Sequence, residues 1–550
     1  RALKSFTAMA LSAILAFGAA GTAAASTNTD NASAAEFSET EPDRAVAFPG
    51  ADGAGKFATG GRGGEIYHVT NLNDSGTGSL RDAVSKGRRI VVFDVGGTIN
   101  LKSDLSISGN ISVMGQTAPG GAGVTVRNGK LAMAGDNIIV RYMTSRPGEK
   151  GSGEYDAWGG SKGSNSIIDH CSIGWANDEQ FGLYSSRNMT MQYSIIGPAN
   201  CLSTHSKGSH GFGPMFGAAS NTWHHNLICH NMSRNFRGKV EREQPNDYVN
   251  NVVYGWGGQT AYGTFGHLNY VNNYFKKSIS SRNGDNFGSL DSGSNYETTK
   301  FFMEGNKMTD RKGNAANPMS TNNWNGGLSL NRSLNYYESH YRASEHFPII
   351  SNGIDVSAAK NPESADAAFN NVVSYAGAAV NLDSRNKIDA EVLNDAYTGS
   401  GSLSGGLENS KVTADVRSKY SIKYVNYDEY YPKSVLKKEI IDSDNDGMPD
   451  DWEIARGLNP NDSSDANGYY IGGAYTNIEH YCNDLTVDSF PEGVVTLSPT
   501  LDELGADYSK AIEDLNSLKL SKTKISSADE ISLPVSGSKF GSKISWSSSS

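Results

Sequence analysis

The stretch NTWHHNLICHNMSRNFRGKV (residues 221–240) opens with an asparagine and continues into a short run of apolar, aromatic and β-branched residues. The same phrase recurs as NISVMG (110–115), NIIVRYMT (137–144), NSIIDHCSI (165–173), NMTMQYSII (188–196) and NDYVNNVVY (246–254). The leading asparagines are 27, 28, 23, 33 and 25 residues apart. A second series consists of Asn226, Asn251, Asn273 and Asn306. Repeats with periods of roughly 20–50 residues are typical of solenoids, propellers and arrays.

Each repeat predicts a short strand, because no helical period of 3.6 residues runs through it. The 62 glycines suit tight corners between such strands. We therefore predict an all-β protein whose main part, residues 45–430, is a parallel β-helix. An asparagine at the same place in each turn can bond the backbone amides of the next turn, so we expect an internal asparagine ladder.

The beginning of the chain predicts export. Arg1 and Lys4 precede an apolar run (residues 11–25) that ends in three alanines, as in a secretory signal peptide. We assign residues 1–25 to that peptide and residues 26–44 to a linker. Because no later segment is apolar enough to span a bilayer, we expect a secreted protein without a membrane partner, and a monomer.

The cysteines and the charge are less decisive. One disulfide among Cys171, Cys201 and Cys229 and a set of buried thiols that includes Cys482 remain equal alternatives. The formal net charge of −11 divides into −1 over residues 1–40, +4 over residues 41–350 and −14 over residues 351–550. We expect no nucleic-acid partner, and the N-terminal part can meet an acidic ligand without repelling it.

Acidic and basic residues are expected to meet at one edge of the solenoid. Asp156 precedes Asn165 by 9 residues and Asp178 follows it by 13, so the two carboxylates can lie on adjacent turns. Carboxylates stacked in this way repel one another unless a cation lies among them, and oxygen ligands favour Ca²⁺. The cations that follow are Lys207, Arg234, Arg237 and Lys239. The alternatives are solvated loop acids, a surface lysine, and a structural ion-pair network with Asp169 or Glu241.

Three stretches carry a resemblance to a known family: FPGADGAGKFATGGRGGEIYHVTNLNDSGTGSLRDAV (48–84), IIDHCSI (167–173) and HHNLICHNMSRNFRGKV (224–240). In this order they resemble secreted pectate lyases of polysaccharide lyase family one, over roughly residues 45–280. The resemblance implies a right-handed parallel β-helix that binds Ca²⁺ and cleaves polygalacturonate, an acidic plant cell-wall polysaccharide, by β-elimination.

The resemblance also implies roles for single residues. Asp156 and Asp178 would hold calcium, Lys207 would meet a substrate carboxylate, and Arg234 would be the catalytic arginine. Arg237 would support catalysis, and the residues assigned to substrate binding are Lys239, His205 and His210. The sequence departs from the family pattern at Phe236, where proline is usual, and at Gly182, where a further acidic ligand is often found. Glu179 is the predicted substitute ligand at the second position; the alternative is that substrate carboxylates complete the shell.

Elimination explains this choice of residues. Removal of the C-5 proton of a galacturonate builds charge beside a carboxylate, which a divalent cation and Lys207 would stabilise. Arginine holds its proton to about pH 12, so we expect Arg234 to react from a minor neutral population that neighbouring cations enlarge. An alkaline activity optimum follows.

The C-terminal part predicts a second calcium site and two further segments. In DSDNDGMPDDWE (442–453), acidic residues stand at loop positions 1, 3, 5, 9 and 12 of an EF-hand-like template, namely Asp442, Asp444, Asp446, Asp450 and Glu453. We assign residues 431–495 to this calcium-loop segment; NDSSDANG (461–468) is only a partial second loop. Residues 496–520 predict a helical linker. Residues 521–550 resemble the first strands of a bacterial immunoglobulin-like module.

Other functions remain open. The chain could be a non-catalytic, calcium-stabilised β-helix that binds glycans, or a pectin lyase. A galacturonan hydrolase should show clustered aspartates around a Gly-Asp-Asp motif, which the sequence lacks. Seven histidines between residues 170 and 267 suggest a zinc enzyme, but their order fits no ligand spacing.

Overall fold

The computed structural model describes residues 45–505 except for 122, 150–152, 218, 241–243, 283–284, 291–297, 330–337, 407–411, 434 and 472, and also 13–14, 510 and 545–546. Apart from those isolated positions, the predicted signal peptide, linker 26–44, the helix beyond residue 505 and the immunoglobulin-like module lie outside the described residues. The chain forms two compact units. The solenoid unit comprises Val46–Glu439 and Cys482–Thr496; the C-terminal unit contains Ile440–Tyr481 and, among the described residues that follow, 497–505.

Three long sheets make up the solenoid unit. The strands of the first are β2 (Glu65–Val69), β3 (Arg89–Phe93), β6 (Ile111–Met114), β9 (Ile138–Arg141), β12 (Ser166–Asp169), β15 (Met189–Gln192), β18 (Thr222–His224), β21 (Pro245–Val249), β24 (His267–Val271) and β27 (Lys300–Glu304). The second contains β34 (Leu436–Lys437), β4 (Val95–Asn100), β7 (Val124–Arg127), β10 (Met143–Ser145), β13 (Ser172–Ile173), β16 (Ile195–Ile196), β19 (Leu227–Cys229), β22 (Val252–Tyr254), β25 (Tyr274–Lys276) and β28 (Lys307–Thr309). The third contains β5 (Leu105–Ile107), β8 (Leu131–Met133), β11 (Trp158–Gly160), β14 (Phe181–Leu183), β17 (Met215–Phe216), β20 (Phe236–Lys239), β23 (Ala261–Thr264), β26 (Gly288–Leu290) and β29 (Leu328–Ser329).

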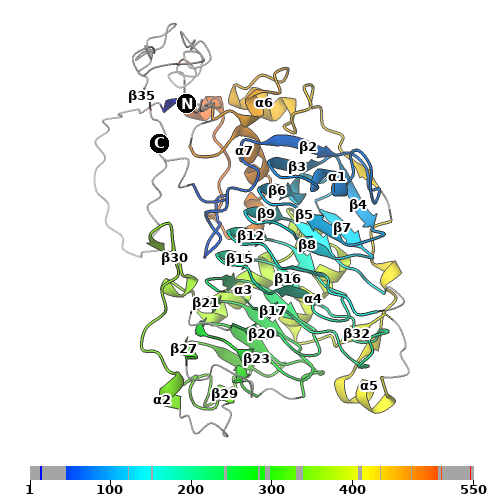
Figure 1. Cartoon of the computed structure of the whole chain (residues 1–550), viewed down its shortest axis with the longest axis vertical. Helices are drawn as coiled ribbons and strands as arrows, with labels where there is room; N and C mark the ends of the chain where they lie inside the picture. Colours follow the sequence, from blue (N-terminus) through cyan, green and yellow to red (C-terminus); the bar gives the residue numbers. More distant parts are fainter. Residues whose placement is uncertain are drawn as a thin grey trace, which may run out of the picture. The chain divides into compact units, whose positions relative to one another are not determined.

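From β3 to β29, hydrogen-bonded neighbours within each sheet are three strands apart in the sequence, so one turn of the chain donates one strand to each sheet. Successive turns stack in parallel, as β12 on β9 and β15 on β12. Figure 1 shows these turns one above another along the solenoid. The exception is β34, which pairs antiparallel with β4. The predicted parallel β-helix is therefore confirmed.

The interior of the solenoid is apolar throughout its length. Strands such as β9 and β12 are buried at every position, with Ile138 and Ile168 among the residues of one continuous core. Rings stack between turns, as Phe236 does on Tyr248, with their centroids 4.5 Å apart. Stacking of equivalent residues buries large apolar areas in every turn, and this burial is the main stabilising contribution.

The second asparagine series forms the expected ladder. The backbone N–H of Asn226 donates to Oδ1 of Asn251 (3.1 Å), Asn251 to Asn273 (2.9 Å) and Asn273 to Asn306 (2.9 Å). All four side chains are fully buried. The ladder satisfies backbone amides at a corner that would otherwise leave them unpaired inside the protein.

The first series behaves differently along its length. Asn110, Asn137, Asn165 and Asn188 adopt the left-handed backbone conformation, with φ between 50° and 58°. Asparagine tolerates that conformation better than most residues, so it turns the corner before each strand of the first sheet. At the next turn Ser220 takes the left-handed position, and Asn221 lies one residue further on and is buried. The repeat thus contains corner asparagines and ladder asparagines, which a common sequence phrase does not distinguish.

The helices are α1 (Leu80–Ala83), α2 (Glu338–Tyr341), α3 (Ala365–Tyr375), α4 (Lys387–Thr398), α5 (Ala414–Tyr420), α6 (Asp450–Arg456), α7 (Asn477–Asp484) and α8 (Leu501–Leu504). Short 3-10 turns lie at Gly115–Thr117, Ala358–Lys360, Leu382–Ser384, Tyr427–Glu429, Asp465–Asn467 and Val487–Ser489. The remaining strands form the pairs β1 (Ala13–Ile14) with β35 (Ser545–Trp546), β30 (Ile350–Ser351) with β31 (Ile354–Asp355), and β32 (Ser404–Gly405) with β33 (Lys423–Tyr424). None of the helices in the described part of the chain is long and apolar enough to cross a membrane.

Helices α3 and α4 cover the outer face of the second sheet. Leu227 and Val252 of that sheet pack with Val372 of α3 and Val392 of α4 in a second buried cluster. Residues 351–430 fall within the predicted β-helix, but they contain α3, α4 and α5, and the first two shield apolar residues of the sheet from water. All four cysteines are buried free thiols, so the open choice is decided in favour of thiols.

Candidate active site

Polar residues gather at the corner where the chain enters the third sheet. Parallel bridges join Glu179 to Phe212 and Phe212 to Ser233 on successive turns. The register of β11 against β14 places Asp156 opposite Glu179. Residues far apart in the sequence therefore lie in one column across four turns of the solenoid.

Three carboxylates meet at this column. One oxygen from each of Asp156, Asp178 and Glu179 lies within 4.8 Å of the others. Burial raises the pKa of Asp156 to about 6, against the opposing charge of Lys130. Burial also acts on Asp178, but the hydrogen bond and charge of His210 outweigh it and hold the pKa of Asp178 below its ordinary value. We refer to the three acids as the solenoid acid cluster.

The donor set of this cluster suits a hard divalent cation. Its ligand atoms are all carboxylate oxygens, and their mutual repulsion is relieved by a cation between them. Gly182 faces the same place, because a Cβ there would lie 4.0 Å from Oδ2 of Asp156. The glycine offers no ligand, whereas Glu179, predicted as its substitute, belongs to the cluster.

Arg234 reaches the cluster from two turns further along the solenoid, past the turn that carries Phe212. It adopts the left-handed conformation (φ 54°), and its Nη1 forms an ion pair with Glu179. The guanidinium lies 4.3 Å from the Phe212 ring centroid, and its Nε donates a hydrogen bond to the Tyr262 hydroxyl (2.9 Å). Arg237 donates to the same hydroxyl through Nη1 (3.2 Å). Tyr262, which the sequence analysis missed, therefore holds both arginines.

Two lysines stand further out. The Lys239 ammonium lies 5.5 Å from the ring centroid of Tyr184, which is 44% exposed. Lys207 is exposed on the loop between β16 and β17, and its backbone N–H donates to Nδ1 of His205 (3.1 Å). The pKa of Glu154, lowered chiefly by a hydrogen bond from Ser206, is lowered further by the charge of Lys207.

The histidines of this loop pack behind the acids, and one of them contacts Asp178. His205 and His210 stack with ring centroids 3.8 Å apart, and Nε2 of His210 lies 3.0 Å from Oδ1 of Asp178. Their exposures, 0% and 5%, favour a supporting role in place of the predicted substrate contact. One ligand atom from each of Asp178, His205 and His210 also lies within 4.8 Å of the others. However, Nδ1 of His205 accepts a hydrogen bond from the backbone N–H of Lys207. A neutral His205 therefore carries its proton on Nε2, which argues against zinc there.

The C-terminal unit holds a second group of carboxylates, here named the C-terminal acid cluster. Oxygens of Asp442, Asp444 and Asp446 lie within 4.8 Å of one another, and so do those of Asp446, Glu453 and Asp465. Four of the five predicted loop residues are thus brought together.

The fifth predicted ligand lies elsewhere. Asp450 accepts hydrogen bonds from the backbone N–H and the hydroxyl of Ser443, both at 2.7 Å. Asp465 takes part in the cluster instead. It comes from the segment 461–468 that matched a calcium loop only in part, and nothing in the spacing of that segment singled it out.

Burial without partners marks the C-terminal acid cluster as a cation site. Both carboxylate oxygens of Asp444 and of Glu453, and one oxygen each of Asp446 and Asp465, are buried without a hydrogen-bond partner among the described residues. Burial, reinforced by the neighbouring acids, raises the pKa of Glu453 to about 9 and that of Asp446 to about 7. Buried anions of this kind are stable only when a cation joins them.

With this geometry in view, similarity to known proteins becomes informative. A protein of Aspergillus flavus named "Probable pectate lyase C" is 34% identical over 457 residues, which cover 81% of this chain and 95% of the relative. One of the same name from Emericella nidulans is 33% identical over 451 residues, or 82% of this chain and 94% of the relative. The chain belongs to the pectate lyase family. No family model matches it.

Solved structures of pectate lyases align with the chain at lower similarity. One described as "Pectate lyase bound to hexasaccharide" is 16% identical with a TM-score of 0.39, covering 61% of this chain and 99% of that one. Another, "Structure of the thermostable pectate lyase PL 47", is 16% identical with a TM-score of 0.41, covering 62% and 99%. The strand order of this chain itself establishes its fold.

Proposed function

We propose that this protein is a pectate lyase that cleaves α-1,4-polygalacturonate by calcium-assisted β-elimination, releasing unsaturated oligogalacturonides. The observation that carries the proposal is the ion pair that joins Arg234 to Glu179 of the solenoid acid cluster, two turns away. Family membership supports the same activity. The expectation of a secreted, monomeric enzyme is part of the proposal.

Asp156, Asp178 and Glu179 would hold the calcium ion. Their oxygens form the donor set that Ca²⁺ prefers, and a bound cation relieves the repulsion among the three carboxylates. When bound, the ion neutralises the substrate carboxylate and stabilises the charge that develops beside it.

The cations of the chain bind and orient the polyanion. Lys207, Arg237 and Lys239 would pair with carboxylates of successive sugars, and a guanidinium can bind a carboxylate through two hydrogen bonds. The Tyr262 ring lies beside the Arg237 guanidinium and the Tyr184 ring beside the Lys239 ammonium, and these cation–π contacts hold both cations in position. The polymer would therefore lie across the third sheet.

Arg234 would take the C-5 proton at a guanidinium nitrogen. The electron pair left behind forms the double bond between C-4 and C-5, the C-4–O bond breaks, and the leaving oxygen takes a proton from solvent. Arg234 forms an ion pair with Glu179, so its guanidinium is free to meet the substrate only when Glu179 is engaged elsewhere.

The geometry disfavours the hydrolase alternative. In glycoside hydrolases the two carboxyl groups stand at least about 5 Å apart and flank the bond that is cut. Here one oxygen from each of the three acids lies within 4.8 Å of the others, so the acids are grouped on one side and do not flank a bond. Elimination needs no attacking water and no second carboxylate.

One assay tests the proposal against a binding-only β-helix. The full chain is mixed with polygalacturonate in the presence of Ca²⁺ or of a chelator, and the ultraviolet absorbance of the unsaturated product is followed. We expect product with calcium and none with chelator, restored when calcium is added in excess. Binding of the polymer without product would overturn the enzymatic assignment, and equal turnover in chelator would overturn the role of calcium.

A further inference from the structure

A cavity of about 380 Å³ lies between helix α4 and residues 401–404 and 423–430 of the solenoid unit. Its inner wall comes from the corners that follow the second sheet, through Trp175, Pro198 and His230. Ligand sites in proteins usually measure about 300–1,000 Å³, so the cavity is large enough for a small molecule. None of its lining residues belongs to the site proposed for elimination.

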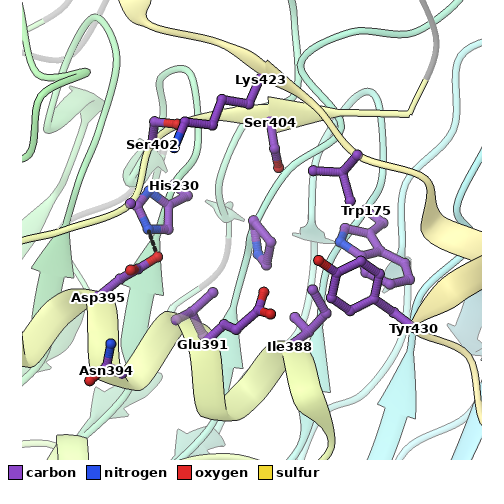
Figure 2. Close-up of a pocket in the computed structure, with 14 residues that line it drawn as sticks. Trp175, His230, Ile388, Glu391, Asn394, Asp395, Ser402, Ser404, Lys423 and Tyr430 are labelled. Carbon is purple, nitrogen blue, oxygen red and sulfur yellow. Dashed lines mark hydrogen bonds and ion pairs between the residues drawn. The ribbon is translucent and has the colours of Figure 1, made fainter.

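Trp175 supplies a donor without a partner. Its side chain is 2% exposed, and Nε1 is buried without a hydrogen-bond partner among the described residues. Tyr427 covers one face of the indole, with centroids 4.3 Å apart, so the ring is fixed in place. Figure 2 shows the edge with the nitrogen turned toward the cavity. Buried indole N–H groups usually find a partner, and a ligand in the cavity would provide one.

Three more polar groups converge on the same space. Figure 2 shows the Glu391 carboxylate reaching up from α4, the Ser404 hydroxyl pointing down from β32, and the Tyr430 hydroxyl directed inward from the side. Asp395, also on α4, accepts from Nε2 of His230 at 3.3 Å. Apolar wall is supplied by Ile388 and Val392.

The acids of the wall already have partners. Glu391 and Asp395 stand one helical turn apart on α4; the half-exposed Glu391 has the Lys387 ammonium 3.9 Å from its Oε1, and Asp395 has His230. Burial raises the pKa of Glu391 against the opposing charge of Lys387. A uronate entering here would add a third carboxylate, whereas a hydroxyl can donate to Glu391 at no such cost.

We propose that this cavity binds one neutral pyranose unit, either a free sugar or the end of a neutral glycan branch. Glu391 accepts from the hydroxyls, Trp175 donates to a ring or hydroxyl oxygen, and the hydroxyls of Ser404 and Tyr430 complete the polar contacts. The site is separate from the one proposed for polygalacturonate and does not depend on that activity.

Saturation-transfer NMR on the full chain tests the proposal with methyl β-D-galactopyranoside and β-1,4-galactotetraose as neutral probes and methyl α-D-galactopyranosiduronate as the acidic one. We expect saturable binding of at least one neutral probe, and no displacement of that probe by the uronate. A preference for the tetrasaccharide would identify a branch end as the ligand, and equal binding a single sugar. No saturable binding of either neutral probe, or displacement of the bound neutral probe by the uronate, would overturn the proposal.

Two variants locate the binding. Glu391→Gln should weaken it about tenfold, the size of a hydrogen bond to a charged group, without changing turnover of polygalacturonate. The matched control Glu345→Gln, at an exposed position outside the cavity, should bind as the wild type does. Thermal unfolding of both variants checks the fold. If Glu391→Gln folds normally and binds undiminished, the cavity is not the site.

Discussion

The two acid clusters of this protein differ in what stands beside their carboxylates. In the solenoid acid cluster, Glu179 is paired with Arg234 and Asp178 with His210. In the C-terminal acid cluster, six buried oxygens have no hydrogen-bond partner in the described part of the chain. The first cluster thus has charged partners of its own, and the second depends on an ion.

This difference indicates different tasks. A site whose ligands already pair with protein cations gains less from an added cation, and it can exchange that ion with substrate present. A site of unpaired buried acids gains much more, so its ion serves the fold. We expect the C-terminal acid cluster to bind Ca²⁺ more tightly and the solenoid acid cluster to use it in catalysis.

The largest expected effect concerns Arg234, the arginine that pairs with the solenoid acid cluster. Arg234→Lys keeps the charge but loses the planar guanidinium, and kcat on polygalacturonate should fall about 1,000-fold, within the range typical of a lost acid–base group. Unfolding should be little changed. Initial rates of ultraviolet absorbance measure the loss, with Arg187→Lys at an exposed position as control. A variant with near wild-type kcat would show that Arg234 is not the base.

The next largest effect is expected from removing one carboxylate of the C-terminal acid cluster. Glu453→Gln removes a buried carboxylate, so the stabilisation by calcium, about 2.7 kcal/mol when the ion is at 100 times its Kd, should largely disappear. Calorimetric unfolding with and without calcium measures it. Asp451→Asn, a change to an exposed neighbour outside the cluster, should keep the full stabilisation. Equal calcium stabilisation in both variants would contradict a structural ion at this place.

The pH dependence of calcium binding should also separate the clusters. A carboxyl with a raised pKa must lose its proton to bind the ion, so affinity falls as pH drops through that pKa. For Asp156, with a pKa of about 6, the affinity of the solenoid acid cluster should fall about tenfold between pH 7 and pH 5.

For Glu453, with a pKa of about 9, the C-terminal acid cluster should lose affinity already between pH 9 and pH 7. Calorimetric titration with calcium of Asp156→Asn and Glu453→Gln, each of which retains one cluster, separates the two profiles. If calcium affinity fell at the same midpoint pH in both variants, the two clusters would not differ in the way that the burial of Asp156 and Glu453 predicts.

The smallest effect concerns the shared hydroxyl. Tyr262→Phe removes the acceptor that holds Arg234 and Arg237, so kcat/KM should fall about fivefold, which corresponds to about 1 kcal/mol, the net size of a typical hydrogen bond. Because a positioning role alters the base itself, the pH–rate profile should shift as well. Tyr184→Phe keeps the ring beside Lys239 and should leave the profile unchanged. An unshifted profile in Tyr262→Phe would reduce Tyr262 to a packing role.

Periodicity made the solenoid predictable, because a stacked turn repeats its chemistry at each corner. The same reasoning missed Tyr262, since only the register of β20 against β23 brings it opposite Arg237. It missed Asp465 because that residue lies outside the twelve-residue loop.

Helix α4 was missed for another reason. Its buried residues Ile388, Val392 and Ala396 recur every four positions, which is a helical signal. The asparagine and strand repeat, on which the prediction rests, does not extend to this segment. Local patterns thus predicted the elements, and tertiary register decided which side chains complete the sites.

Asp178→Asn tests the central claim most directly, because it removes one negative charge from the solenoid acid cluster while its amide can keep the contact with His210. Turnover of polygalacturonate is measured against free calcium for this variant and for the wild type. The account predicts a calcium midpoint at least about tenfold higher in the variant, with most activity recovered at high calcium. An unchanged calcium midpoint would contradict the claim that these carboxylates hold the catalytic ion.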